Sequence, residues 1–323
     1  MTFLRNPIVI GILVLFLFLL LLGWYWSGEP EFMTLDKPAE PTERTVVGVA
    51  TTEMLIKSAE KLLNKRGGYL SNDISPPSVF MDNQPNWEFG VLQQIRDLAK
   101  ALRNDYSRSQ TQSVADRHLE VAEPKFNVDS EAWMFPSAEG EYQEGIDALE
   151  KYLARLRDVS RENAQFYARA DNLNEWLGLV EKRLGSLSQR LSKARPQIRV
   201  NTDLAGDKNA QQSTESSSEV VSKTSFLEID DNFYEARGTA WALIHFLRAA
   251  EIDFKPVLED KNAIPTLRQI IRELESTQQD VDSPMILNGS GMGMFANHSL
   301  VMSSYIGRAN SAIADLRNLL ADG

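Results

Sequence analysis

The stretch QFYARADNLNEWLGLVEKRLGSLSQRLS, residues 165–192, carries the clearest periodicity in the chain. Apolar residues recur along it at alternating steps of four and three: Phe166, Ala170, Leu173, Leu177, Val180, Leu184, Leu187 and Leu191. This spacing sets one apolar stripe along an α-helix. The stretch therefore predicts an amphipathic helix that buries one face.

The same alternation begins earlier, from Tyr142 to Leu156, and its register shifts before Phe166. No proline interrupts the 59 residues from 137 to 195, so one continuous helix here would be ~88 Å long. Either the segment is one very long coiled-coil helix, or it bends near the register shift and packs back as a hairpin. Small Ala and polar Asn residues on the apolar stripe favour a helical-bundle core over an exposed dimeric coil.

Helical periodicity, caps and stop signals recur along the rest of the chain, whereas no convincing run of alternating strand residues is present. Further helices are expected at residues 52–66, 86–102, 114–122, 233–252, 262–279 and 297–320. The 114–122 helix is expected to end before Pro124, and Pro265 is expected in the first turn of the 262–279 helix. The predicted fold class is all-α: an N-terminal transmembrane helix followed by a helical bundle.

The N-terminal segment 8–26, IVIGILVLFLFLLLLGWYW, contains 19 residues and no charge. At ~1.5 Å per residue it nearly crosses a ~30 Å hydrocarbon layer, and Trp24, Tyr25 and Trp26 are typical of a membrane interface. A cleavable signal peptide is the competing interpretation, but the apolar run is long and WYWSGEP offers no small-x-small cleavage site. We therefore predict an uncleaved membrane anchor. Arg5 precedes the span, which favours a cytoplasmic N-terminus at residues 1–7 and an exported remainder.

The exported part divides into a tether and one helical domain. Residues 27–50 contain Pro30, Pro38 and Pro41 among acidic residues, and are expected to form an extended tether. Residues 51–323 are expected to form the helical domain, interrupted by a disordered linker at 203–223, where Ser and Gln dominate and little is apolar.

Composition narrows the function classes. The chain has no cysteine, which excludes disulfides, thiolate chemistry and Cys-ligated metals, and its net charge of −11 argues against a nucleic-acid partner. The three histidines are widely spaced and match no metal motif, so neither a metal nor another cofactor is expected. No nucleophile elbow or paired-carboxylate signature stands out, so no catalytic residue is assigned. Whether the protein is an enzyme stays open, with the balance against it.

Two uncharged or irregular loops are the candidate contact surfaces. NGSGMGMF, at 288–295, has its glycines in the wrong places for a dinucleotide fingerprint and lacks the lysine of a P-loop. It lies within 25 uncharged residues, 283–307, that hold four of the nine methionines. Such a segment can pack on its own bundle, bind a partner or touch lipid, and methionine suits adaptable contacts. The candidate interaction residues, from this segment and the irregular stretch 69–86 with the helix start beyond it, are Tyr69, Phe80, Trp87, Met292, Met294, Phe295, Asn297 and His298.

Several stretches resemble an uncharacterised bacterial family, a domain of unknown function whose members have one N-terminal membrane span. The resemblance rests on YLSNDISPP, DNQPNWEFGVLQQIRDLAKALR, SRSQTQS, QFYARADNLNEWLGLVEKRLGSLSQRLS and ANHSLVMSSYIGRAN. It implies a single-pass protein of the bacterial inner membrane with its bulk in the periplasm. It implies no catalytic residue.

The sequence as a whole predicts a membrane-anchored periplasmic domain that acts by protein–protein interaction, as a scaffold or accessory component of a cell-envelope assembly. Its expected partners are membrane lipid, through the N-terminal helix, and an envelope protein or a second copy of the chain. The alternatives are an envelope enzyme acting on peptidoglycan or lipid-linked glycan, and a periplasmic ligand sensor.

Overall fold

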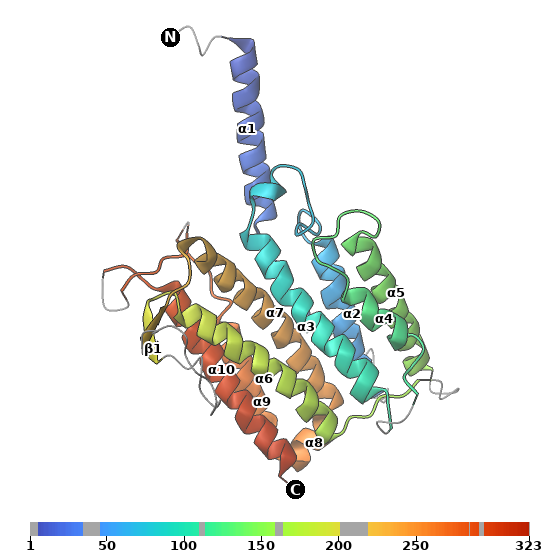
Figure 1. Cartoon of the computed structure of the whole chain (residues 1–323). Helices are drawn as coiled ribbons and strands as arrows, with labels where there is room; N and C mark the ends of the chain where they lie inside the picture. The colour runs from blue at the N-terminus through green and yellow to red at the C-terminus, as the bar shows by residue number, and fades with distance from the viewer. Residues whose placement is uncertain are drawn as a thin grey trace, which may run out of the picture.

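Helices dominate the computed structural model, which describes residues 6–34, 46–109, 114–158, 164–200, 219–283, 285–290 and 294–322. The N-terminal helix α1 projects from one end of a helical bundle, and the C-terminus lies at the opposite end (Figure 1). The predicted all-α class, with an apolar N-terminal helix, is confirmed.

Helix α1, Pro7–Trp26, begins at Asn6, whose side-chain oxygen accepts a hydrogen bond of 3.0 Å from the amide of Ile8. Pro7 fits the first turn, where its missing N–H is not needed. None of the side chains of α1 is buried in the bundle. By length and composition it is the one helix in the described residues that could cross a membrane.

The centre of the bundle is the pair α3, Asn83–Ala101, and α7, Ile229–Asp253. Two glycines let their backbones approach: a Cβ on Gly238 would lie 2.0 Å from the carbonyl oxygen of Trp87, and one on Gly90 would lie 2.2 Å from that of Glu235. The Trp87 and Trp241 rings then pack at 5.3 Å beside this crossing. Because larger residues would force the helices apart, the glycines set the crossing.

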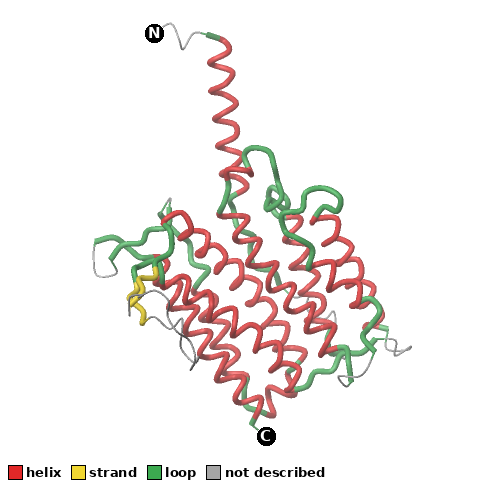
Figure 2. Tube along the Cα trace, viewed as in Figure 1, coloured by secondary structure: helices red, strands yellow, loops and turns green. Residues whose placement is uncertain are grey.

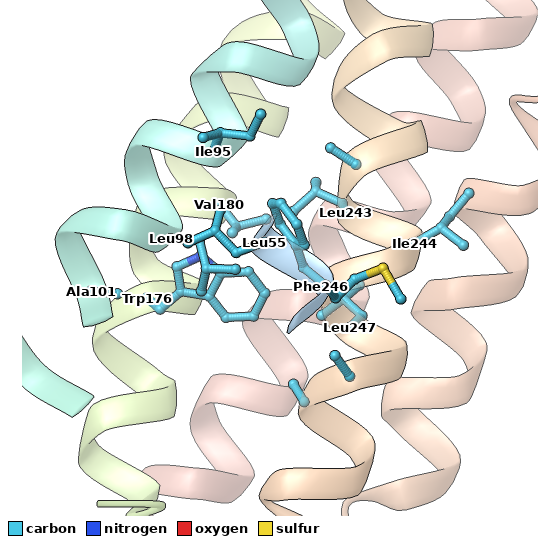
Figure 3. Packing of buried hydrophobic residues seen from close by; sticks show 14 of the residues in the cluster. Leu55, Ile95, Leu98, Ala101, Trp176, Val180, Leu243, Ile244, Phe246 and Leu247 are labelled. Carbon is cyan, nitrogen blue, oxygen red and sulfur yellow. The ribbon is translucent and has the colours of Figure 1, made fainter. Parts of the chain in front are cut away.

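The remaining helices cover two flanks of the central pair (Figure 1). One flank consists of α2 (Val49–Asn64), α4 (Leu119–Phe126) and α5 (Ala138–Arg157). The other consists of α6 (Ala170–Ser192), α9 (Ile264–Ser276) and α10 (His298–Ala321), with α8 (Lys255–Asp260) near the C-terminal end. Side chains from α2, α3, α6 and α7 meet in the core between them (Figure 3).

The predicted helix 137–195 is in fact two helices on different flanks. Helix α5 ends at Arg157 and packs on α2 and α4, whereas α6 begins at Ala170 and packs on α10, so the two form neither one long helix nor a hairpin. Tertiary contacts explain the interruption: Phe166 packs on Tyr106 and Phe254, and the amide of Tyr167 donates to the carbonyl of Tyr106 at 2.6 Å. These contacts need an extended backbone, which a continuous helix would abolish.

Smaller differences concern a linker and a proline. Most of the predicted linker, residues 201–218, lies outside the described residues, but its end forms β2 (Glu219–Ser222), paired antiparallel with β1 (Gln197–Val200) (Figure 2). Helix α4 contains Pro124 instead of ending before it. The N–H that this proline lacks would have bonded to the carbonyl of Glu120, which is an exposed residue. Pro265 lies in the first turn of α9, as predicted.

Candidate interaction surface

The end of α1 is fixed to the bundle through three contacts. The Arg66 guanidinium lies over the Tyr25 ring, 5.4 Å from its centroid. The Trp26 ring covers Gly67, where a Cβ would lie 2.7 Å from the ring and φ is +85°. Any other residue at this position would therefore clash with Trp26 and strain the backbone. Gln84 donates to the carbonyl of Ser27 at 2.6 Å.

Residues 27–34, called the strap, continue from α1 along the bundle and carry a buried ion pair. The Glu29 carboxylate accepts two hydrogen bonds from Arg237, of 2.7 Å from Nε and 2.8 Å from Nη2. Arg237 is buried and also donates to the carbonyls of Thr277 and Gln279. Paired, two-pronged contacts of this kind are strong and directional, so they hold the strap in one place on α7.

The second attachment of the strap is a buried histidine. The amide of Met33 donates to Nε2 of His245 at 2.9 Å, so the proton of the neutral ring is on Nδ1, which lies 2.6 Å from the Trp241 carbonyl. The Phe32 ring lies over the same imidazole, at 5.5 Å, and under the Arg248 guanidinium, at 5.7 Å. Burial lowers the pKa of His245 to about 4, which keeps the ring neutral and able to accept the bond.

The strap is the first part of the predicted extended tether, residues 27–50. Residues 27–34 pack on the bundle, residues 35–45 lie outside the described residues, and α2 begins at Val49. The apolar helix and the bundle are therefore joined by specific contacts instead of a loose connection.

Two loops lie at the end of the bundle from which α1 projects, residues 65–82 and 127–137 (Figure 1). The first is built on a fully buried ion pair, Lys65 to Glu88, at 2.6 Å. The same Glu88 carboxylate accepts from the amides of Leu70, at 2.9 Å, and Ser71, at 2.8 Å. Burial raises the pKa of Glu88, and the Lys65 ammonium opposes this shift. The pair holds the loop backbone against α3.

Asn72 joins the two loops. Its side-chain amide donates to the carbonyl of Ala132 at 2.9 Å and to the carboxylate of Glu139 at 2.6 Å. The hydroxyl of Tyr69 adds a bond of 3.1 Å to the carbonyl of Ser130. The loops thus form one connected structure.

This structure displays six apolar side chains to solvent, here called the apolar rim. They are Ile74, Val79, Phe80, Trp133, Met134 and Phe135. Phe135 is 93% exposed and has φ of +47°, and Phe80 is 82% exposed. A left-handed backbone is unfavourable for an aromatic residue, and the loop nevertheless holds Phe135 there, pointing outward.

A second exposed surface lies at the start of α10. The described residues 285–290 and 294–297, called the methionine loop, expose Met285, Met294 and Phe295. Asn297 donates to the carbonyl of Gly289 at 2.8 Å, and Nδ1 of His298 accepts from the amide of Leu287 at 3.0 Å. The loop thus has a defined backbone beneath its exposed side chains.

A groove of about 440 Å³ adjoins this loop, between α7, α9 and α10. Its apolar lining includes Phe233, Met302 and Tyr305, and its polar lining includes Asp280, Asp282 and His298. A lining that combines apolar side chains with a few charged groups suits a partner's side chain.

The structure separates the candidate residues into groups. Tyr69 and Trp87 are buried in the core, and Asn297 is buried where its side chain caps α10 by accepting from the amide of Leu300 at 2.9 Å. His298 lies between loop and groove. Phe80 lies on the apolar rim, Met294 and Phe295 on the methionine loop, and Met292 lies outside the described residues.

The strap contacts and the three rim residues of the 127–137 loop were not among the residues predicted from the sequence. The signal for Trp133, Met134 and Phe135 was present: AWMFP is an apolar run in a short irregular connection, bounded by proline. The Glu29–Arg237 pair spans more than 200 residues of sequence and has no local signal. Within the described ranges, no group of three or more His, Asp or Glu side chains is placed to hold a metal ion.

Comparison with known proteins gives one match. No curated protein and no solved structure matches the chain. A family model described as "Uncharacterized protein conserved in bacteria (DUF2333)" matches residues 3–323.

Proposed function

We propose that this chain, which belongs to the bacterial family that the family model describes, is a single-span inner-membrane protein that acts as a scaffold in a cell-envelope assembly. The observation that carries the proposal is the strap: the Glu29–Arg237 and Met33–His245 contacts fix the bundle relative to α1. A scaffold that aligns partners at a membrane needs one orientation of its domain, and these contacts supply one.

The case for anchoring rests on α1. Its 20 residues carry no Asp, Glu, Lys or Arg, and its large apolar side chains project away from the bundle. Lipid is the environment that removes such a surface from water. Trp24, Tyr25 and Trp26 stand at the junction with the bundle, where a membrane interface favours aromatic rings. The basic N-terminus, with Arg5, favours a cytoplasmic start and a periplasmic bundle.

The case for a protein partner rests on the methionine loop. Met285, Met294 and Phe295 are exposed although the backbone beneath them is hydrogen-bonded, and the adjoining groove offers an apolar recess. Aromatic and methionine side chains beside a recess are typical of the centre of a protein interface. This is the surface on which we expect the partner to bind.

Site-specific photocrosslinking in intact cells tests the proposal. A photoreactive residue at Phe295 should give a discrete heavier adduct that contains a second protein. The matched control is a photoreactive residue at Asp260, an exposed position at the far end of the bundle, which should give none. No adduct at Phe295, or the same adducts at both positions, would refute the interaction function. Protection of residues beyond Thr51 from protease added to spheroplasts would refute the periplasmic orientation.

A further inference from the structure

The 65–82 loop, which carries half of the apolar rim, contacts α1. A Cβ on Gly23 would lie 3.5 Å from the Pro77 side chain and 3.8 Å from the sulfur of Met81, so the loop that carries Ile74, Val79 and Phe80 touches the helix there. Gly23 precedes Trp26 by three residues, or ~4.5 Å along the helix axis. The loop thus reaches past the aromatic end of α1 and alongside its apolar run.

That contact fixes the depth of the rim, given the anchoring of α1 under the proposed function. With Trp24 and Trp26 at the interface, Gly23 lies at the boundary of the hydrocarbon layer, and the interfacial layer beyond it is ~5–8 Å thick on each side. A loop that contacts Gly23 lies within this layer. The 65–82 loop, with its share of the rim, therefore occupies the depth at which lipid headgroups meet acyl chains, and Asn72 joins the 127–137 loop to it at the same end of the bundle.

The chemistry of the rim suits that depth. Phe80, Trp133 and Phe135 are aromatic and exposed, and aromatic side chains favour the interfacial layer. In the two loops Lys65 is buried in its pair with Glu88, and Arg66, which lies over Tyr25, is the one other cation, so attraction to anionic lipids is confined to Arg66. Apolar insertion is therefore the main source of affinity. A modest gain in binding free energy from the rim suffices, because α1 already holds the rim at the bilayer.

The same geometry favours lipid over a protein as the occupant. A protein bound to the rim would have to displace the lipid that surrounds α1 at Gly23, whereas lipid covers both surfaces without a break. The buried Lys65–Glu88 pair and the Asn72 bonds hold the rim in place before anything covers it. We propose that the apolar rim inserts into the interfacial layer of the bilayer beside α1 and forms a second membrane contact, which fixes the tilt of the bundle.

Quenching by spin-labelled lipids tests this inference on the full chain in phosphatidylcholine nanodiscs. The chain has no cysteine, so a fluorophore can be attached to single introduced cysteines. Ser75→Cys reports on the rim loop and leaves all six rim residues in place. Leu17→Cys reports on α1, and Asp260→Cys reports on the far end of the bundle (Figure 1).

The expected result is strong quenching at Leu17 and Ser75 and none at Asp260. Lipids labelled near the headgroup should quench the Ser75 reporter best. In a Phe80→Ser, Phe135→Ser background, the inserted fraction at Ser75 should fall about tenfold or more, because two aromatic side chains no longer enter the bilayer. The Leu17 signal should not change.

The outcomes separate this inference from the proposed function. An unquenched Leu17 reporter would refute the membrane anchor, and with it the proposed function. If the Leu17 reporter is quenched and the Ser75 reporter is quenched no more than the Asp260 reporter, rim insertion is refuted and the membrane anchor is not. Quenching at Ser75 that is unaffected by the two serine substitutions would also refute it, since closeness to α1 would then explain the signal. An unquenched Ser75, with a protein adduct from a photoreactive residue at Phe80, would assign the rim to a protein instead.

Discussion

The substitution Glu29→Gln isolates the ion pair that fixes the strap. Glutamine keeps the size of the side chain and one acceptor oxygen, but it removes the charge and turns an NH2 group toward Arg237. The two side chains are only 18% and 8% exposed, so solvent does little to replace the lost partner. Breaking a buried pair by removing one member costs about 3–5 kcal/mol, and the partial exposure places this one near 3 kcal/mol.

That loss should appear as release of the strap and not as unfolding of the bundle. Arg237 keeps its bonds to the carbonyls of Thr277 and Gln279, and the core does not depend on Glu29. Since 1.36 kcal/mol changes an equilibrium constant tenfold, a loss of 3 kcal/mol raises the fraction of molecules with a detached strap by about 100-fold. The amide of Met33 should therefore exchange its hydrogen about 100-fold faster in the variant, measured by mass spectrometry on the full chain in nanodiscs.

The matched control is Glu259→Gln. Glu259 pairs with Lys255 at 3.7 Å, and both side chains are more than half exposed, so its loss should change stability by less than about 0.5 kcal/mol. A Glu29→Gln variant whose Met33 amide exchanges within threefold (about 0.6 kcal/mol) of the wild-type rate would refute the argument that this pair fixes the strap.

Three further predictions concern the helix crossing, the histidine and the second buried pair. Gly238→Ala should lower stability by about 2 kcal/mol in thermal unfolding, because overpacking at a backbone contact costs about 3 kcal/mol and the higher helix propensity of alanine restores about 1 kcal/mol. At Gly185 a Cβ would meet only the Asn310 side chain, at an ordinary 3.6 Å, so Gly185→Ala should be neutral or stabilising. His245 has a pKa of about 4 when folded and 6.5 when unfolded, so its contribution is intact above pH 6.5, and up to about 3 kcal/mol is lost as the pH falls through 4. Glu88→Gln should lower stability by about 3 kcal/mol or more, seen as a lower unfolding temperature, since it leaves a buried ammonium without a counter-charge.

Each of these has an outcome that contradicts it. Equal stability of the two glycine variants would show that the α3–α7 backbones do not meet as described. For the histidine, a His245→Gln variant that keeps the wild-type dependence of stability on pH between 7 and 4 would assign that dependence to other groups. A Glu88→Gln variant with unchanged unfolding temperature would show that Lys65 finds water or another acceptor.

The fold class could be predicted because helix formation here is encoded locally. The stripe from Leu173 to Leu191 buries one face of α6, as its spacing indicates, and Asn297 caps α10 through a bond to a neighbouring amide. The break between α5 and α6 could not be predicted in the same way. It depends on Phe166 packing against Phe254, a residue almost 90 positions away.

The candidate surface was predicted only in part for the same reason. The exposed Phe80, Met294 and Phe295 lie in loops that composition alone marks as unusual. Tyr69 lies in the irregular stretch 69–86, as Phe80 does, and Trp87 follows it directly, yet Tyr69 and Trp87 are core residues. Only tertiary packing decides which apolar side chains of a loop turn inward.

The contacts of the strap predict that the bundle is held at one orientation to α1. Distances between spin labels at Leu17→Cys in α1 and Asp260→Cys at the far end of the bundle, measured by pulsed electron resonance in nanodiscs, test it most directly. A fixed junction predicts one narrow distance distribution, which broadens when Glu29→Gln releases the strap. A broad distribution in the otherwise wild-type chain would contradict the account, because it would show that the bundle moves freely on its anchor.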